Sequence, residues 1–146
     1  MEKKALELSN FQLWLLIGKV NYSIFLARQR ELNRYHIPVR QLHVLRAIHD
    51  LGSKATLSEV AGRVERETHW ISRQAISMEK DGLITRSRDI PKSKILKLEL
   101  TETGLHMVKI ANRSKTIDAA LSVLNKKERQ QLASNLNKIL VNLKES

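Results

Sequence analysis

One stretch, residues 68 to 81 with the sequence THWISRQAISMEKD, constrains the fold of this chain more than any other. Its apolar residues Ile71, Ala75 and Met78 are spaced by four and three residues, so they line one side of an α-helix and predict that this side is buried. Several polar side chains and one large ring project away from it: Thr68, His69, Trp70, Ser72, Arg73 and Ser77. Such a helix must pack on a neighbouring core, and Gly82 suits its end.

Further patterns lie directly before and after this helix. Thr56 and Glu59 form a capping box that starts a short helix, whose buried set is expected to be Leu57, Val60, Ala61 and Val64. Leu83 to Arg88 and Ile95 to Leu100 are predicted strands, because apolar and charged residues alternate in the second of them. The order helix, turn, helix, hairpin predicts a mainly α fold with a small two-stranded β wing, a winged helix-turn-helix.

Amphipathic helices are also expected on both sides of this core. They are predicted over Asn10 to about Tyr35, over Val39 to Leu51, from Thr101 to about Leu124, and from Asn125 onward. We interpret residues 1–146 as a single domain, with a winged-helix core at about 37–101 flanked by N- and C-terminal dimerisation helices at about 9–36 and 102–146. If the apolar stripes of these flanking helices were exposed, they would favour aggregation. We therefore expect a homodimer that buries them.

The net charge of +11, from 26 Lys and Arg against 15 Asp and Glu, favours a polyanionic partner. Positive charge is concentrated between Arg86 and Lys97, where five cations face one aspartate, so we place nucleic acid ahead of an anionic membrane. The chain has no cysteine, no secretory signal pattern and no apolar stretch near the roughly 20 residues that span a bilayer. We therefore expect a cytoplasmic protein without a membrane partner.

DNA binding would divide the candidate residues into two groups. Cations that neutralise phosphates supply affinity without sequence information, and the candidates are Arg63, Arg66, Arg88, Lys92 and Lys94. Base reading is assigned to Thr68, His69, Ser72 and Arg73, with Trp70 and Ser77 on the same helix. Arg73 could pair bidentately with guanine or clamp a phosphate instead. A dimer would place two reading helices about one DNA turn apart, which predicts a pseudo-palindromic operator.

With these pieces in order, the chain resembles the MarR family of bacterial transcription regulators, which are winged-helix homodimers. The resemblance is carried by Leu57 to Val64, by Ile71-Ser72-Arg73 through Met78-Glu79-Lys80-Asp81-Gly82-Leu83-Ile84, and by Leu100-Thr101-Glu102-Thr103-Gly104. It implies a DNA-binding regulator, and we expect a repressor. Family wings usually carry an aspartate followed by arginines, where this chain has Lys92, Ser93 and Lys94. Trp70 replaces a small residue, and it could contact DNA or be tucked against a neighbour.

The resemblance also implies a small effector, because family members often respond to phenolic or carboxylate compounds. Candidate residues are aromatic on the first helix, chiefly Trp14 and Tyr22, and cationic on the next, namely Arg40, His43 and Arg46. A small aromatic or anionic effector would bind between the dimerisation helices and the winged helix and lower the affinity for DNA. The alternative interpretation is that the aromatic residues are simply dimer core.

Other functional classes fit the sequence less well. An enzyme would need a catalytic, metal or cofactor site, but the chain lacks a cysteine nucleophile, a Gly-rich phosphate loop and histidines at metal-ligand spacing. A nucleoid protein that binds any duplex could use the same fold and charge. A helical module that binds an acidic protein would leave the charge of the hairpin without a purpose.

Overall fold

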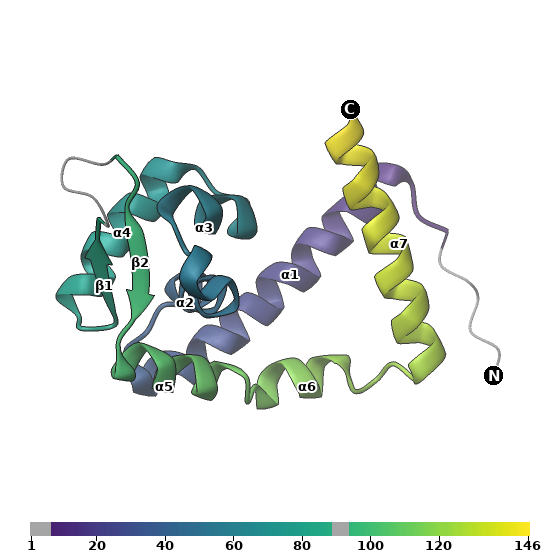
Figure 1. Ribbon diagram of the computed structural model, residues 1–146. Helices are drawn as coiled ribbons and strands as arrows, with labels where there is room; N and C mark the ends of the chain where they lie inside the picture. Colours follow the sequence, from purple (N-terminus) through teal and green to yellow (C-terminus); the bar gives the residue numbers. More distant parts are fainter. Residues whose placement is uncertain (1–6, 89–93) are drawn as a thin grey trace. The chain divides into compact units, whose positions relative to one another are not determined.

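The computed structural model describes residues 7–88 and 94–146. The chain divides into two compact units, Met1–Ser114 and Lys115–Ser146. The first unit contains α1 (Asn10–Leu32), α2 (Val39–Leu51), α3 (Leu57–Val64), α4 (Thr68–Lys80), β1 (Ile84–Ser87), β2 (Lys97–Leu100) and α5 (Glu102–Ala111), with short 3-10 turns at Asn33–Tyr35 and Gly52–Lys54 (Figure 1). The second contains α6 (Lys115–Leu121) and α7 (Lys126–Glu145). The expected mainly α fold with a two-stranded wing is confirmed.

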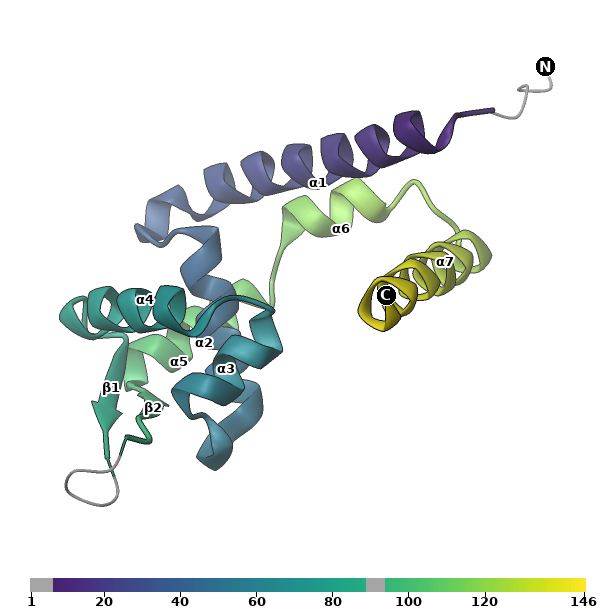
Figure 2. The same cartoon turned by 90° about the horizontal axis from the view of Figure 1, so that it is seen from above.

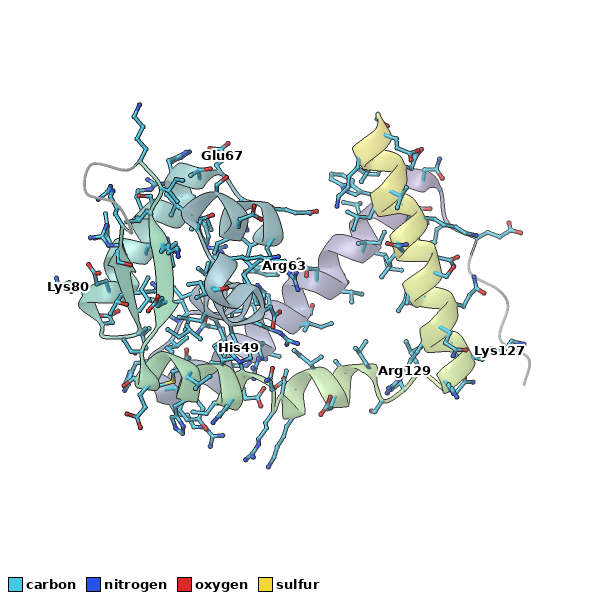
Figure 3. All side chains as sticks on the ribbon, viewed as in Figure 1. His49, Arg63, Glu67, Lys80, Lys127 and Arg129 are labelled. Atoms are coloured by element: carbon cyan, nitrogen blue, oxygen red, sulfur yellow. The ribbon has the colours of Figure 1, made fainter. Side chains whose placement is uncertain are left out.

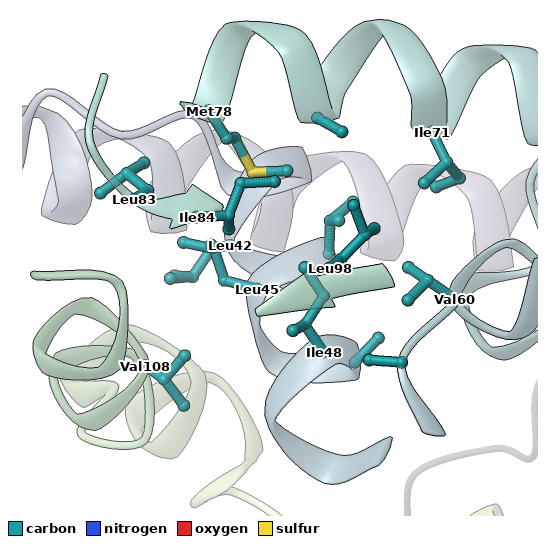
Figure 4. Packing of buried hydrophobic residues seen from close by; sticks show 14 of the residues in the cluster. Leu42, Leu45, Ile48, Val60, Ile71, Met78, Leu83, Ile84, Leu98 and Val108 are labelled. Atoms are coloured by element: carbon teal, nitrogen blue, oxygen red, sulfur yellow. The ribbon is translucent and has the colours of Figure 1, made fainter. Parts of the chain in front are cut away.

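The core of the first unit is built around α2. Leu45 and Val44 on this helix are fully buried, and they share one hydrophobic cluster with Ile71, Ala75 and Met78 of α4, which are buried as predicted. Figure 4 shows Leu45, Ile71 and Met78 within this cluster. Further buried side chains come from α1, α3, β1, β2 and α5 and from the connections between the elements. They include Val60, Leu83, Ile84, Leu98 and Val108. This shared core fixes the position of α4 relative to the wing.

The two strands form an antiparallel hairpin in which Ile84 pairs with Leu100 and Ser87 pairs with Lys97. Both strands are shorter than the sequence predicted. A third segment extends the sheet, because the Leu98 N–H donates to the Ala55 carbonyl at 2.8 Å and the Leu57 N–H to the Leu96 carbonyl at 2.9 Å. The connection before α3 is thereby attached to the wing.

The end of the wing is fixed by Thr101 and Gly104. The Thr101 hydroxyl donates to the Gly82 carbonyl at 2.6 Å and accepts from the Gly104 N–H at 3.1 Å, so it caps α5 and contacts the end of α4. A Cβ at Gly104 would collide with the carbonyl oxygen of Leu83. Gly82, with φ +76°, takes the left-handed conformation that glycine favours at a helix end.

The long helix expected from Thr101 to about Leu124 is instead two helices, α5 and α6, separated at residues 112–114. The buried Arg28 of α1 explains the end of α5, because its Nη2 donates to the Ala111 carbonyl at 2.9 Å while Nη1 lies 3.0 Å from Glu31. The Ser114 hydroxyl donates to the same Glu31 carboxylate at 3.2 Å. The bond from Arg28 satisfies the Ala111 carbonyl, which would accept from the backbone N–H of residue 115 in a continuous helix.

Helix α1 exposes apolar side chains over most of its length, and Phe11 and Trp14 are each 64% exposed. In the second unit, α7 begins at Asn125 with the predicted capping box and exposes a similar set: Leu132, Leu136, Ile139, Leu140, Val141 and Leu143. None of the helices among residues 7–88 and 94–146 combines the length and apolar character that crossing a membrane requires.

Candidate nucleic-acid interface

The outward side of α4 is a stripe of four residues spaced by four, three and four: His69, Arg73, Ile76 and Lys80. All four are exposed, and they lie opposite the buried side of the helix. Figure 3 shows Lys80 projecting away from the body of this unit. Ile76 and Lys80 were not among the site residues predicted from the sequence. The helical period that identified the buried side could have found them, since it places them opposite that side.

The first turn of α4 begins without a side-chain cap from Glu67, whose carboxylate instead lies 3.1 Å from Nδ1 of His69. Both side chains are exposed. With Nδ1 engaged by Glu67, Nε2 is the ring nitrogen that can meet a base edge. Thr68 is exposed beside this pair and Ser72 is half-buried one turn later. The predicted base-reading residues of the first two turns therefore lie on one surface.

Ser77 has a tertiary partner. The buried side chain of Gln41 on α2 donates from Nε2 to the Ser77 hydroxyl at 3.5 Å and to Oε1 of Gln74 at 3.3 Å. These bonds join the second half of α4 to α2. A role for Ser77 in DNA binding stays a prediction, and its hydroxyl already accepts a bond within the unit.

Trp70 is half-buried and packs against the core, with the guanidinium of Arg66 5.3 Å from the centroid of its ring. This arrangement matches the possibility that the ring is tucked against a neighbour. It also places Arg66 at the start of α4. Arg63, on α3, lies 3.4 Å from the Asp50 carboxylate, so part of its charge is balanced.

The wing is attached to α4 by Glu79 and Arg86. Glu79 accepts from the Arg86 backbone N–H at 3.0 Å, from Nε at 3.1 Å and from Nη2 at 3.0 Å. Hydrogen bonds from the side chain and the backbone of Arg86 lower the pKa of Glu79 below its ordinary value of 4.5. Arg86 is therefore a positioning residue for the wing, and its charge is balanced.

Two of the remaining cations predicted to neutralise phosphates lie at the ends of the wing strands. Arg88 follows β1 and Lys94 precedes β2, and both are exposed. Lys92 lies outside the described residues. Because β1 is attached to the end of α4 through Glu79, the wing and α4 belong to the same packed unit, and Figure 2 shows α4 and β1 next to each other.

The candidate effector residues fall into two groups. Arg40 and His43 line a hollow of about 120 Å³ with Arg66 and Trp70, and His43 and Arg46 line another of about 280 Å³. Partial burial, followed by the charges of Arg28, Arg46 and Arg66, lowers the pKa of His43 below its ordinary value of 6.5. Trp14 and Tyr22 line neither hollow and are exposed on α1.

The fold and this surface define a winged helix-turn-helix protein whose α4 exposes a basic side. Residues 37–90, from α2 to just past β1, match the sequence model of the MarR family. The match covers this segment of the chain, and it confirms the resemblance to the MarR family that the sequence indicated. No match to the chain was found among curated proteins.

Solved structures of regulators share this fold. The Staphylococcus aureus regulator MepR, solved as a complex with DNA, has a TM-score of 0.79 at 21% identity, over 93% of this chain and 99% of that one. A single-site mutant of Escherichia coli MarR, solved with operator DNA, has a TM-score of 0.81 at 19% identity, over 88% and 93%. The organohalide-sensing regulator RdhR, solved with 2,4-dichlorophenol, has a TM-score of 0.78 at 25% identity, over 95% and 88%.

Proposed function

We propose that this chain is a transcription regulator that recognises a specific DNA sequence by inserting α4 into the major groove. The observation that supports this most directly is the exposed stripe His69, Arg73, Ile76 and Lys80 on a helix whose other side is locked into the core. Exposed cations beside it, on the wing, can neutralise phosphates. Two proteins of similar fold were solved bound to DNA.

The competing proposal is a protein that binds any duplex through its charge alone. The test selects bound duplexes from a random pool and then compares a selected duplex with a scrambled one at physiological salt. A specific regulator should prefer the selected sequence by about 10³-fold or more. Equal affinity for both duplexes would contradict sequence recognition and favour the nucleoid protein.

We further propose that the regulator acts as a homodimer and represses transcription. The apolar side chains exposed along α1 and α7 need a covering partner, and a second copy of the chain supplies the same surfaces with two-fold symmetry. A symmetric dimer would bind a pseudo-palindromic operator, and its presence over a promoter would exclude the polymerase. Deleting the gene should raise expression from a promoter that the protein footprints. A fall in expression would identify an activator.

We also propose that a small aromatic or anionic effector releases the operator. Arg40, His43 and Arg46 share one side of α2 beside two hollows, and an anion there would contact the two guanidinium groups and a ring N–H of His43. The RdhR structure contains a chlorinated phenol, which supports this class of ligand. An effector must bind the DNA-incompetent state of the dimer more tightly than the DNA-competent state, so binding to the dimer does not by itself lower the affinity for DNA. Aromatic acids titrated into the operator complex should dissociate it, and failure of all of them at millimolar concentration would contradict effector control.

A further inference from the structure

Ile76 is a large apolar side chain on the outward side of α4. It is 53% exposed, and in the described part of residues 27–114 the only other large hydrophobic side chain exposed to a similar extent is Ile95, at the wing. Elsewhere in this range, large apolar side chains are buried or half-buried. Both exposed isoleucines thus belong to the two elements expected to meet DNA.

The position of Ile76 on α4 makes its side chain point away from the core. It lies three residues after Arg73 and four before Lys80, so it occupies the middle of the outward stripe. It does not belong to the core cluster or to the residues packed against it. A β-branched side chain in a solvated helix position also has a lower helix propensity than the long polar residues. Neither packing within this unit nor helix formation therefore accounts for isoleucine here.

We propose that Ile76 reads the C5-methyl group of a thymine in each half of the operator. This inference rests on the proposed DNA-reading role of α4. In the major groove, thymine alone presents a methyl group, whereas the other base edges present hydrogen-bond donors and acceptors that an isoleucine would leave unpaired. Arg73, one turn away, can take the polar edge of a neighbouring base pair. Ile76 then specifies a thymine beside the base that Arg73 contacts.

The contact has an expected size. Removing one methyl group from a buried apolar contact corresponds to a loss of affinity of about fourfold in each half-site. With two half-sites on a dimer the loss is about 15-fold when both methyl groups are removed. Replacing thymine with deoxyuridine removes only this methyl group and leaves the base pair and its hydrogen bonds intact.

The experiment uses three forms of the full-length protein: the parent, Ile76→Ser and, as a matched control, Ile76→Val, which keeps a β-branched apolar side chain. Duplexes are first selected from a random pool by the parent. The thymines of the selected site are then replaced by deoxyuridine one symmetric pair at a time, and affinities are measured for all three proteins. We expect one symmetric thymine pair whose replacement weakens DNA binding by the parent and by Ile76→Val about 15-fold but leaves the affinity of Ile76→Ser nearly unchanged. Equal unfolding curves for the three proteins check that the fold is retained.

Two negative results are distinguishable. If the parent enriches no sequence, the proposed function fails and the inference fails with it. If the parent enriches a clear site, but no deoxyuridine replacement separates it from Ile76→Ser, sequence recognition stands and the assignment of a thymine to Ile76 is overturned.

Discussion

Arg73 projects from the outward side of α4, and no core side chain depends on it. Replacing Arg73 with alanine should weaken binding of a selected operator by about 1 to 3 kcal/mol while leaving the unfolding curve unchanged, because a groove-facing cation is lost without core volume. Lys109→Ala on α5 is the matched control, since it removes an exposed cation of the same sign from another helix. Operator affinity equal to that of the parent would show that α4 does not read the operator through this residue.

Gly104 is required by close packing. A Cβ at this position would meet the Leu83 carbonyl oxygen, so Gly104→Ala forces α5 away from the end of the wing and should destabilise the fold by about 1 to 3 kcal/mol. Gly62→Ala on α3 is the control, because a Cβ there has nothing within 4 Å. Urea unfolding of both variants measures the difference. Equal stability of Gly104→Ala and Gly62→Ala would contradict the packing argument.

At the scale of elements, the bond network between Glu79 and Arg86 should make attachment of the wing depend on pH. The pKa of Glu79 is lowered in the folded state, so its contribution to stability is fully present above the ordinary value of 4.5 and is lost as pH falls through the lowered pKa. Glu79→Gln should therefore be less stable than the parent at pH 7, and the gap should close in acid below pH 4.5. Urea unfolding at several pH values tests this. A gap independent of pH would exclude the ionised carboxylate as its cause.

The wing also contributes charge through Arg88 and Lys94. Replacing both with alanine should weaken all duplexes alike and lower the slope of log affinity against log salt by about two, since two phosphate contacts are lost. Lys109 and Lys138, replaced together, provide a control of equal charge change elsewhere in the chain. A loss confined to one DNA sequence would show that these cations read bases.

At the scale of the whole molecule, the exposed apolar side of α7 should hold a dimer. Removing residues 132–146 deletes Leu136, Ile139 and Leu143, which are 44%, 45% and 64% exposed, and should give monomers or aggregates with weak operator binding. Sedimentation measures the dimer content. The control is Gln131→Ala with Lys138→Ala, which changes polar residues on the same helix. A truncated chain that remains fully dimeric would exclude α7 from the dimer contact.

Local patterns in the sequence were sufficient for much of this fold. The spacing of Ile71, Ala75 and Met78 predicted the buried side of α4, and the capping residues at Thr56 and Asn125 predicted where two helices begin. These features depend on residues within one or two turns of each other, so the sequence contains them directly. The same period also determines which residues of α4 point outward, and with them the candidate reading stripe.

Tertiary structure decided the features that join distant residues. Arg28 bonds to Ala111, 83 positions away, where a continuous helix was expected, and Gln41 bonds to Ser77, one of the predicted DNA contacts. Arg86, counted among the cations of the wing, has its charge balanced by Glu79. Periodicity and capping describe only near neighbours along the chain. Partners in such bonds are chosen by the packing of whole helices and strands, which brings their side chains together only after the core has formed.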